Sequence, residues 1–274
     1  MKITLIEPRG FCFGVCRALE MLDSVLSQKP YVLHDIIHNK QVVNRYKEKG
    51  VTFVDDLDDV PKGAHLVLSA HGVSRKIEAA AKKDFVVIDT TCPFVRKNHL
   101  WVQRLEAQNI PIILIGKSNH IEVVGTLGQL QNPKNAFVVS CVKDVDFLPV
   151  FSEVGAVIQT TFCFDTARQV IQALHKKYEK VFFQKGICNT SEERQAAVRV
   201  AAKTHQMILV VGDKSSSNAR RLVDVAKNAG ADSILVETPD DLKNVRFPDR
   251  VAITSAASAP EEIVEQVLSF LKQY

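Results

Sequence analysis

Residues 207–218, Met207-Ile208-Leu209-Val210-Val211-Gly212-Asp213-Lys214-Ser215-Ser216-Ser217-Asn218, lead from an apolar strand through a hydroxyl-rich loop into a helix predicted over 217–228. Residues 251–272 repeat this arrangement, with Thr254-Ser255-Ala256-Ala257-Ser258-Ala259-Pro260 as the loop. Small residues let a phosphate approach the backbone, and the first N–H groups of a helix supply donors and a positive dipole end. Helix capping alone would explain either loop, but two such loops, together with the histidines described below, favour a diphosphate ligand.

Short β-rich runs alternate with amphipathic stretches along the whole chain, which is typical of α/β units with largely parallel sheets. The pattern predicts strands over 3–6, 32–36, 66–69, 86–89, 112–115, 137–139, 156–159, 207–211, 233–236 and 251–254, and helices over 17–27, 74–83, 94–108, 165–177, 192–204, 217–228 and 260–272. Residues 87–91 and 157–161 echo each other as strands that end in two threonines, a weak hint of repetition. Most unusual polar clusters follow a predicted strand, where open parallel sheets bind ligands.

Length and composition set the broad class of protein. A chain of 274 residues with 46% hydrophobic residues is long enough for two or three small domains. The net charge of +4 does not indicate nucleic-acid binding, although a local positive pocket for an anion stays open. The N-terminal apolar run is too short for a signal peptide, and no stretch reaches the roughly 18 apolar residues of a membrane helix. We therefore expect a cytoplasmic protein that binds neither membrane nor nucleic acid.

The six cysteines are expected to be thiols or metal ligands, because disulfides are rare in the cytoplasm. Cys12, Cys92 and Cys188 each lie before a helix, and Cys12 and Cys92 also follow a predicted strand. They are far apart in the sequence, unlike the clustered ligands of zinc fingers and bacterial ferredoxins. One cysteine from each of three units could hold three irons of a cubane cluster and leave the fourth iron open. Cys141 and Cys163 resemble ordinary strand-end or core residues, and Cys16 fits either interpretation.

Three histidines, His38, His71 and His120, follow predicted strands. Imidazole offers directional donors and is protonated near neutral pH, so these residues suit an anion. Taken singly, each could merely satisfy loop backbone. Glu122 is the only carboxylate in the middle of these polar loops. As a proton donor it would need a raised pKa in a dry pocket, and otherwise it is a solvated loop residue.

Taken together, these segments resemble the 4-hydroxy-3-methylbut-2-enyl diphosphate reductase family, also called IspH or LytB. The resemblance covers nearly the whole chain and rests on nine segments in the family's order: Pro8-Arg9-Gly10-Phe11-Cys12, His38-Asn39, Ser69-Ala70-His71-Gly72-Val73-Ser74, Thr91-Cys92-Pro93, His120 with Glu122, Gln159-Thr160-Thr161, Ile187-Cys188, Gly212 with Ser216-Ser217-Asn218, and Ala257-Ser258-Ala259-Pro260. Each segment alone is weak evidence for the family, whereas nine segments in the family's order are specific for it.

The resemblance implies three small α/β lobes in a pseudo-threefold arrangement around a central iron–sulfur cluster, with lobes over 13–92, 93–188 and 189–274 plus 1–12. It implies that Cys12, Cys92 and Cys188 ligate a [4Fe–4S] cluster. The diphosphate of the substrate would be held by His38, His71, His120, Ser216, Ser217, Asn218 and Ser258. Thr160 would lie near the substrate hydroxyl, with Glu122 as proton donor and His120 beside it. The implied reaction is a two-electron reductive dehydroxylation of the allylic diphosphate to isopentenyl and dimethylallyl diphosphate. Ferredoxin or flavodoxin is the implied electron donor.

The chain departs from the family pattern at several positions. Ile121 stands where a proline is usual, Lys117 where a histidine is common, and Ala256 where glycine is frequent, and the chain ends soon after Ser258. None of these changes removes an expected ligand or proton donor. The alternatives are a divergent, non-catalytic iron–sulfur sensor of the same fold, a zinc-dependent hydrolase and a plain phosphate-binding module. A sensor would need neither Glu122 nor the full diphosphate set.

Overall fold

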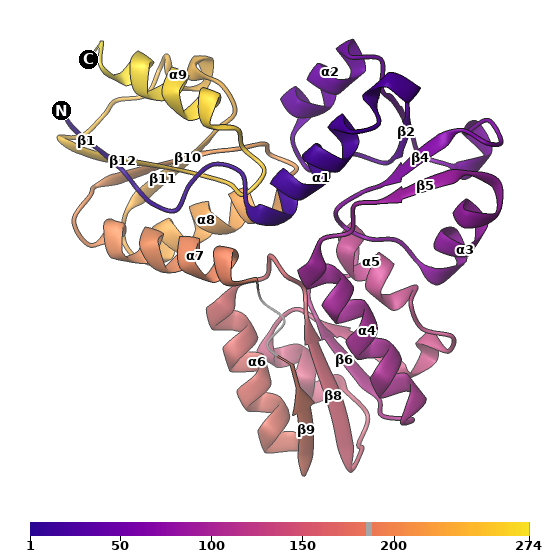
Figure 1. The fold of residues 1–274 in the computed structure, drawn as a ribbon. Coiled ribbons are helices and arrows are strands. Elements are labelled where there is room, and N and C mark those ends of the chain that lie inside the picture. The colour runs from indigo at the N-terminus through magenta and orange to yellow at the C-terminus, as the bar shows by residue number, and fades with distance from the viewer. Residues whose placement is uncertain (185–187, 274) are drawn as a thin grey trace. The chain divides into compact units, whose positions relative to one another are not determined.

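The computed structural model describes residues 1–184 and 188–273, and within them the strands form three parallel four-stranded sheets (Figure 1). Sheet A has the order β11 (Asp232–Val236), β10 (Met207–Val211), β12 (Arg250–Ser255) and β1 (Lys2–Leu5). Sheet B has the order β3 (Thr52–Val54), β2 (Tyr31–Leu33), β4 (His65–Leu68) and β5 (Val86–Asp89). Sheet C has the order β7 (Ala136–Val139), β6 (Ile112–Ile115), β8 (Glu153–Ile158) and β9 (Lys180–Phe183). The α/β class predicted from the sequence is confirmed.

The three sheets share one topology when β1 is counted as the fourth strand of sheet A, after β10, β11 and β12. The second strand then lies at an edge of each sheet, and the first lies beside the third. An α-helix follows the first strand, a 3₁₀ turn precedes the third, and α-helices follow the third and the fourth. In sheet B these helices are α2 (Lys40–Glu48), α3 (Arg75–Asp84) and α4 (Pro93–Ala107); in sheet C they are α5 (Ile121–Leu127), α6 (Phe164–Lys177) and α7 (Asn189–Ala202); in sheet A they are α8 (Ser217–Asn228), α9 (Glu261–Leu271) and α1 (Phe13–Asp23). The 3₁₀ turns are η2 (Leu57–Asp59), η4 (Val142–Phe147) and η5 (Pro239–Leu242), with η1 (Leu26–Gln28) and η3 (Pro133–Asn135) elsewhere. Sheet A is therefore completed by the first strand of the chain.

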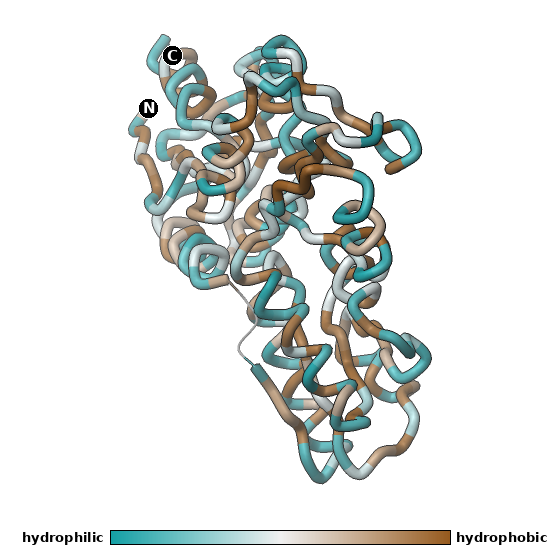
Figure 2. Tube along the Cα trace, turned by 45° about the vertical axis from the view of Figure 1, so that its right-hand side comes forward, coloured by the Kyte–Doolittle hydropathy of each residue, from teal (hydrophilic) through white to brown (hydrophobic). Residues whose placement is uncertain are grey.

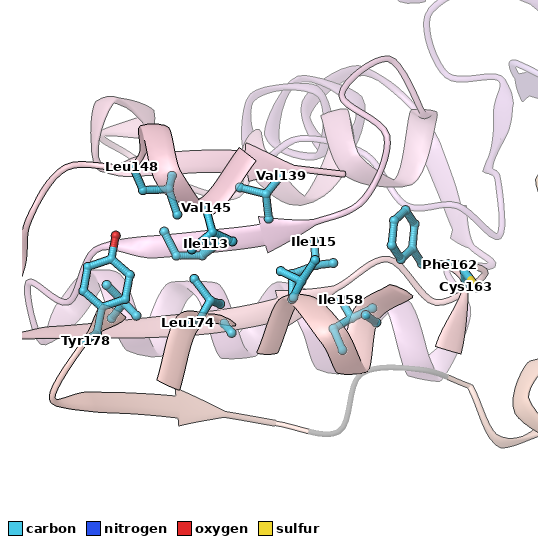
Figure 3. Close-up of a cluster of buried hydrophobic side chains, with 14 residues drawn as sticks. Ile113, Ile115, Val139, Val145, Leu148, Ile158, Phe162, Cys163, Leu174 and Tyr178 are labelled. Carbon is cyan, nitrogen blue, oxygen red and sulfur yellow. The ribbon is translucent and has the colours of Figure 1, made fainter. Parts of the chain in front are cut away.

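The central strands are apolar along their whole length because helices cover both faces of a parallel sheet. All residues of β6 and β10 are buried. When the chain is coloured by hydropathy, strand segments are largely brown and helix turns change between teal and brown (Figure 2). In the core of sheet C, Val145 and Leu148 pack over Ile113, with Tyr178 at one end and Phe162 at the other (Figure 3).

Every predicted strand and helix overlaps an element of the structure. Among the strands and α-helices of the described residues, β3, β9, α2 and α5 were not predicted. Strands β3 and β9 lie at sheet edges, where few residues are buried, so their apolar signal is weak. Helix α2 is mostly polar, and α5 has only seven residues. The echo between 87–91 and 157–161 does not mark equivalent positions, because β5 is the fourth strand of its sheet and β8 the third.

By its internal contacts the chain divides into two compact units. The first contains residues 1–16, 38–43 and the chain from Cys188 onward, with sheet A; the second contains residues 17–37 and 44 to the end of β9, with sheets B and C. The three lobes over 13–92, 93–188 and 189–274 plus 1–12 stay a prediction, although each sheet falls inside one of these ranges. Ile187, part of one family segment, lies outside the described residues. No helix within the described ranges combines the length and apolar character needed to cross a membrane.

Gly72 carries a close packing contact in the second unit. Its φ of 74° is left-handed, and a Cβ at this position would lie 2.5 Å from Cε1 of the buried His99 on α4. Burial lowers the pKa of His99 to about 4, so the ring is neutral near pH 7 and packs as an uncharged group. The loop after β4 therefore rests directly on α4.

We expect Gly72→Ala to destabilise the protein more than Gly63→Ala. Both glycines have positive φ, which costs other residues about 1–2 kcal/mol, but no atom lies within 4 Å of a Cβ built at Gly63. Overpacking against His99 adds about 1–3 kcal/mol at Gly72 only. Denaturant unfolding of the apoproteins measures the difference, and equal losses in the two variants would contradict the packing account.

Candidate functional site

The three predicted ligand cysteines occupy equivalent places in the three sheets. Each follows the fourth strand and directly precedes the next helix: Cys12 before α1, Cys92 before α4 and Cys188 before α7. In each case the cysteine carbonyl accepts a backbone N–H from four residues on, at 2.8–3.1 Å. Thiols at helix starts lie near unpaired N–H groups and the positive dipole end, which favour a thiolate. None of the three forms a disulfide within the described residues, and all three are partly exposed.

Cys12 and Cys188 lie in the first unit, and Cys188 acts electrostatically on the Cys12 thiol. Burial is the main cause that raises the pKa of the Cys12 thiol, and the Cys188 thiolate raises it further. The backbone N–H groups of Val15 and Gly14 hydrogen-bond the sulfur and oppose this effect. A bound cationic metal group would favour the thiolate form of Cys12, because metal ligation requires thiolate ligands. This donor set fits an iron–sulfur cluster.

The remaining cysteines have different settings. Cys163 is buried at the start of α6, which follows a third strand, and Cys141 precedes the 3₁₀ turn η4. Cys16, which the sequence left open, lies within α1 and donates its N–H to the carbonyl of Cys12. None of the three shares the position that Cys12, Cys92 and Cys188 have in common.

Glu122 lies in the first turn of α5 and is 2% exposed, so it is neither in a loop nor solvated. One carboxylate oxygen accepts the backbone N–H of Thr160 at 2.7 Å, and the other accepts its hydroxyl at 2.7 Å. Burial raises the pKa of Glu122 to about 7, against the opposing effect of the two bonds from Thr160. Near neutral pH this carboxyl group can both hold and release a proton.

His120 caps the start of the same helix. Its Nδ1 accepts the backbone N–H of Glu122 at 3.2 Å, so the proton of the neutral ring lies on Nε2. The His71 ring lies 6.4 Å from the His120 ring, centroid to centroid, in an edge-to-face arrangement. Gly125, one turn after Glu122, lets α5 approach the carbonyl of Gly72. The loops after β4, β6 and β8 thus bring His71, His120, Glu122 and Thr160 together.

Two buried amides that the sequence analysis did not single out as site residues hold this group. Gln159 accepts the N–H of Lys117 at 3.0 Å and donates to the Thr161 hydroxyl at 2.9 Å. Asn98, on α4, donates to the Ile158 carbonyl at 2.8 Å. They fix the strand end that carries Thr160. The available signal for Asn98 was its place on the buried face of a helix between Val95 and Val102.

The hydroxyl-rich loops of the first unit also meet. Ser216 caps α8, and the Asn218 amide oxygen accepts the N–H of Ala257 at 2.9 Å. Ser217 is the first residue of that helix and is buried. The Nδ2 of Asn218 is buried and has no partner among the described residues. An unused donor at a helix start is consistent with an anionic ligand.

Residues 38–43 are bonded to these loops. The Ser258 hydroxyl donates to the His38 carbonyl at 3.0 Å, and the Asn39 side chain donates to the Ser258 carbonyl at 2.9 Å. The Asp213 carboxylate accepts the Lys40 N–H at 2.9 Å. His38 therefore lies with Ser216, Ser217, Asn218 and Ser258 in one unit.

The predicted binding and catalytic residues share one topological position. They follow the first strands (His38, His120, Ser216, Ser217 and Asn218) and the third strands (His71, Thr160 and Ser258) of the three sheets. First and third strands are parallel neighbours, and the order in which strands are added to the sheet reverses between them, which is where open α/β sheets bind ligands. In each sheet, these residues therefore lie at the edge where a ligand is expected to bind.

Comparison with known proteins identifies the family. The model of the LytB protein family matches residues 3–272. The chain belongs to the LytB family. A LytB relative from Actinobacillus pleuropneumoniae serotype 3, named 4-hydroxy-3-methylbut-2-enyl diphosphate reductase, is 41% identical over 99% of this chain and 90% of its own. A relative of the same name from Haemophilus influenzae is 40% identical over 100% and 91%. The solved structure of the reductase from Plasmodium falciparum has a TM-score of 0.92 and 38% identity, covering 98% of this chain and 87% of its own.

The departures from the LytB pattern fit the fold locally. Ile121 is the first residue of α5, so the helix starts there without the usual proline. Ala256 is fully buried and donates its N–H to the Val211 carbonyl at 2.8 Å. Lys117 donates its backbone N–H to Gln159, a bond that does not depend on its side chain. The loops keep their hydrogen bonds with these side chains in place.

The raised pKa of Glu122 predicts a pH-dependent stability. Between pH 4.5, its ordinary value, and about 7, the unfolded chain releases this proton while the folded protein keeps it. The stability of the wild type relative to Glu122→Gln is therefore highest below pH 4.5 and falls by on the order of 3 kcal/mol as the pH rises to about 7. Denaturant unfolding of both apoproteins across this range checks it. A difference that does not change with pH would show that burial does not shift this pKa.

Proposed function

We propose that this chain is a 4-hydroxy-3-methylbut-2-enyl diphosphate reductase, the enzyme of the non-mevalonate pathway that yields isopentenyl and dimethylallyl diphosphate. Membership of the LytB family and near full-length relatives of that name support the assignment. The observation that carries it is the buried pair of Glu122 and Thr160, a proton donor poised near neutral pH. A non-catalytic sensor has no use for such a donor.

The diphosphate of the substrate is held by His38, His71, His120, Ser216, Ser217, Asn218 and Ser258. The unused Nδ2 donor of Asn218 and the helix start at Ser216 support this assignment. Neutral hydroxyl and amide donors bind an anion without introducing charge that must be desolvated. Binding energy from the diphosphate, which does not react, fixes the allylic end of the substrate against the catalytic residues.

Cys12, Cys92 and Cys188 hold a [4Fe–4S] cluster through three thiolates. Their equivalent places after the fourth strands and their helix-start settings support this assignment. When bound, the cluster supplies electrons and a Lewis-acidic iron without a protein ligand. Ferredoxin or flavodoxin is the proposed electron donor, and the mildly basic chain suits an acidic partner. Cysteines that form no disulfide within the described residues suit a cytoplasmic enzyme.

Glu122 delivers a proton to the departing hydroxyl oxygen, because hydroxide is a poor leaving group and water a good one. The Thr160 hydroxyl orients the carboxyl group and lies where the substrate hydroxyl would bind. Burial raises the pKa of this carboxyl group to about 7, so a large fraction of it holds a proton near neutral pH, and burial keeps it away from bulk water. The reaction consumes two electrons and two protons, breaks one carbon–oxygen bond and releases one water.

We expect Cys12→Ser, Cys92→Ser and Cys188→Ser each to lose iron and acid-labile sulfide in protein prepared without oxygen. Serine is a poorer ligand than thiolate for these irons, and the cluster has one ligand position open already. Cys141→Ser and Cys163→Ser are matched controls that should keep a wild-type content. Stoichiometric zinc without iron in the wild type would overturn the assignment in favour of a hydrolase.

We expect Glu122→Gln to keep its cluster and its affinity for the allylic diphosphate while turnover falls by about 10²–10⁴-fold, since an amide donates no proton. Turnover is followed by product formation with a chemical reductant, and binding by the substrate-induced change in the absorption spectrum. Full turnover in Glu122→Gln would remove Glu122 from the mechanism. A wild type that holds the cluster and does not reduce the diphosphate would favour the iron–sulfur sensor.

A further inference from the structure

Arg194 is a buried cation that the reaction described above does not use. It lies on α7, the helix that begins directly after Cys188, and is only 2% exposed. It is among the largest fully enclosed side chains of the protein. Burying a guanidinium requires strong compensation, because the charge leaves water.

The guanidinium joins the Cys12 loop to the end of β12. Its two terminal nitrogens donate to the carbonyls of Ser255 and Gly10, each at 2.7 Å. The N–H of Gly10 in turn donates to the Ser255 hydroxyl at 2.7 Å. The Cys12 N–H continues this attachment by donating to the Ala257 carbonyl at 3.0 Å. The planar fork of arginine thus fixes the Cys12 loop against the sheet from the helix that carries Cys188.

Within the part of the chain that the structure describes, Arg194 donates no hydrogen bond to a carboxylate. Its two acceptors there are neutral carbonyls, and its buried Nε has no partner among these residues. Burial is the main cause that lowers the pKa of the Arg194 guanidinium, and the side chains of Cys12 and Cys188 oppose this effect ahead of Glu7 and Glu261.

The two nearby carboxylates are already paired. Arg9 forms ion pairs with both Glu7 and Glu261. Both carboxylates are therefore bonded to Arg9 and not to Arg194. As thiolate ligands of a cluster, Cys12 and Cys188 would supply negative charge close to Arg194.

We propose that Arg194 is a positioning residue for the iron–sulfur cluster, whose buried positive charge acts on the Cys12 and Cys188 ligands and favours the reduced cluster. The inference rests on the proposed function. Each electron added to the cluster makes the group more negative, and a fixed cation in a poorly solvated site stabilises that form. Arg194 therefore raises the reduction potential and makes it easier for an electron donor to load the cluster.

The test is a redox titration of the reconstituted holoprotein without substrate, with Arg194→Met and Arg194→Lys beside the wild type. The Met variant keeps side-chain bulk and loses the charge, so its reduction equilibrium should weaken at least tenfold, about 59 mV more negative for a one-electron couple. The Lys variant keeps the charge and should retain nearly the wild-type potential. Arg199→Met removes a charge from the same helix and should leave the potential unchanged.

A Met variant with a full cluster and the wild-type potential would overturn the proposal. If the Met variant loads no cluster, the Lys variant decides: a loaded Lys variant with a near wild-type potential supports the role of charge, and failure equal to that of Met overturns it. Failure of the proposed function is distinct, because it would appear as a wild type without a cluster or without turnover of the diphosphate.

Discussion

All four strands of each sheet run in the same direction, so their carboxyl ends meet at one edge of that sheet. The loops that follow them therefore start from a common line, whatever their separation in sequence. Because all three sheets have the same strand order, each loop can be compared with the loops that follow the equivalent strands of the other two sheets. Loops after first and third strands carry hydroxyl, amide and imidazole groups, and loops after fourth strands carry the three cysteines. Parallel pairing thus decides which side chains can act together within each unit.

Buried polar groups in this protein are held mainly by backbone atoms. Thr160 presents both its N–H and its hydroxyl to Glu122, and two carbonyls hold Arg194. Backbone partners lose little conformational freedom when they form these bonds. They carry no net charge, so they do not neutralise the buried group, which can still act electrostatically on other atoms. A carboxyl group with a raised pKa and a cation beside two thiols are both products of this arrangement.

The sequence was most informative where apolar runs were long and polar loops followed them. Buried strands such as β6 and β10 were predicted closely, whereas the edge strands β3 and β9 bury too little to be recognised. The sequence analysis did not single out Arg194. Its only signal in the sequence is its place four residues before Val198, on the same buried face of the helix. Its role depends on Ser255 and Gly10, and pairings so distant along the chain leave no mark in local sequence.

The pairing of β1 with β12 has a consequence for the order in which the protein matures. Lys2 lies opposite Arg250, so β1 leaves the ribosome long before β12, the strand with which it pairs. Until β12 is made, Cys12 has neither the carbonyl of Ala257 nor the Ser255 anchor that holds its loop beside α7. Sheets B and C are complete in sequence by Phe183 and need no such wait. The metal-binding loop at the start of the chain is therefore among the last parts of the first unit to take its final form.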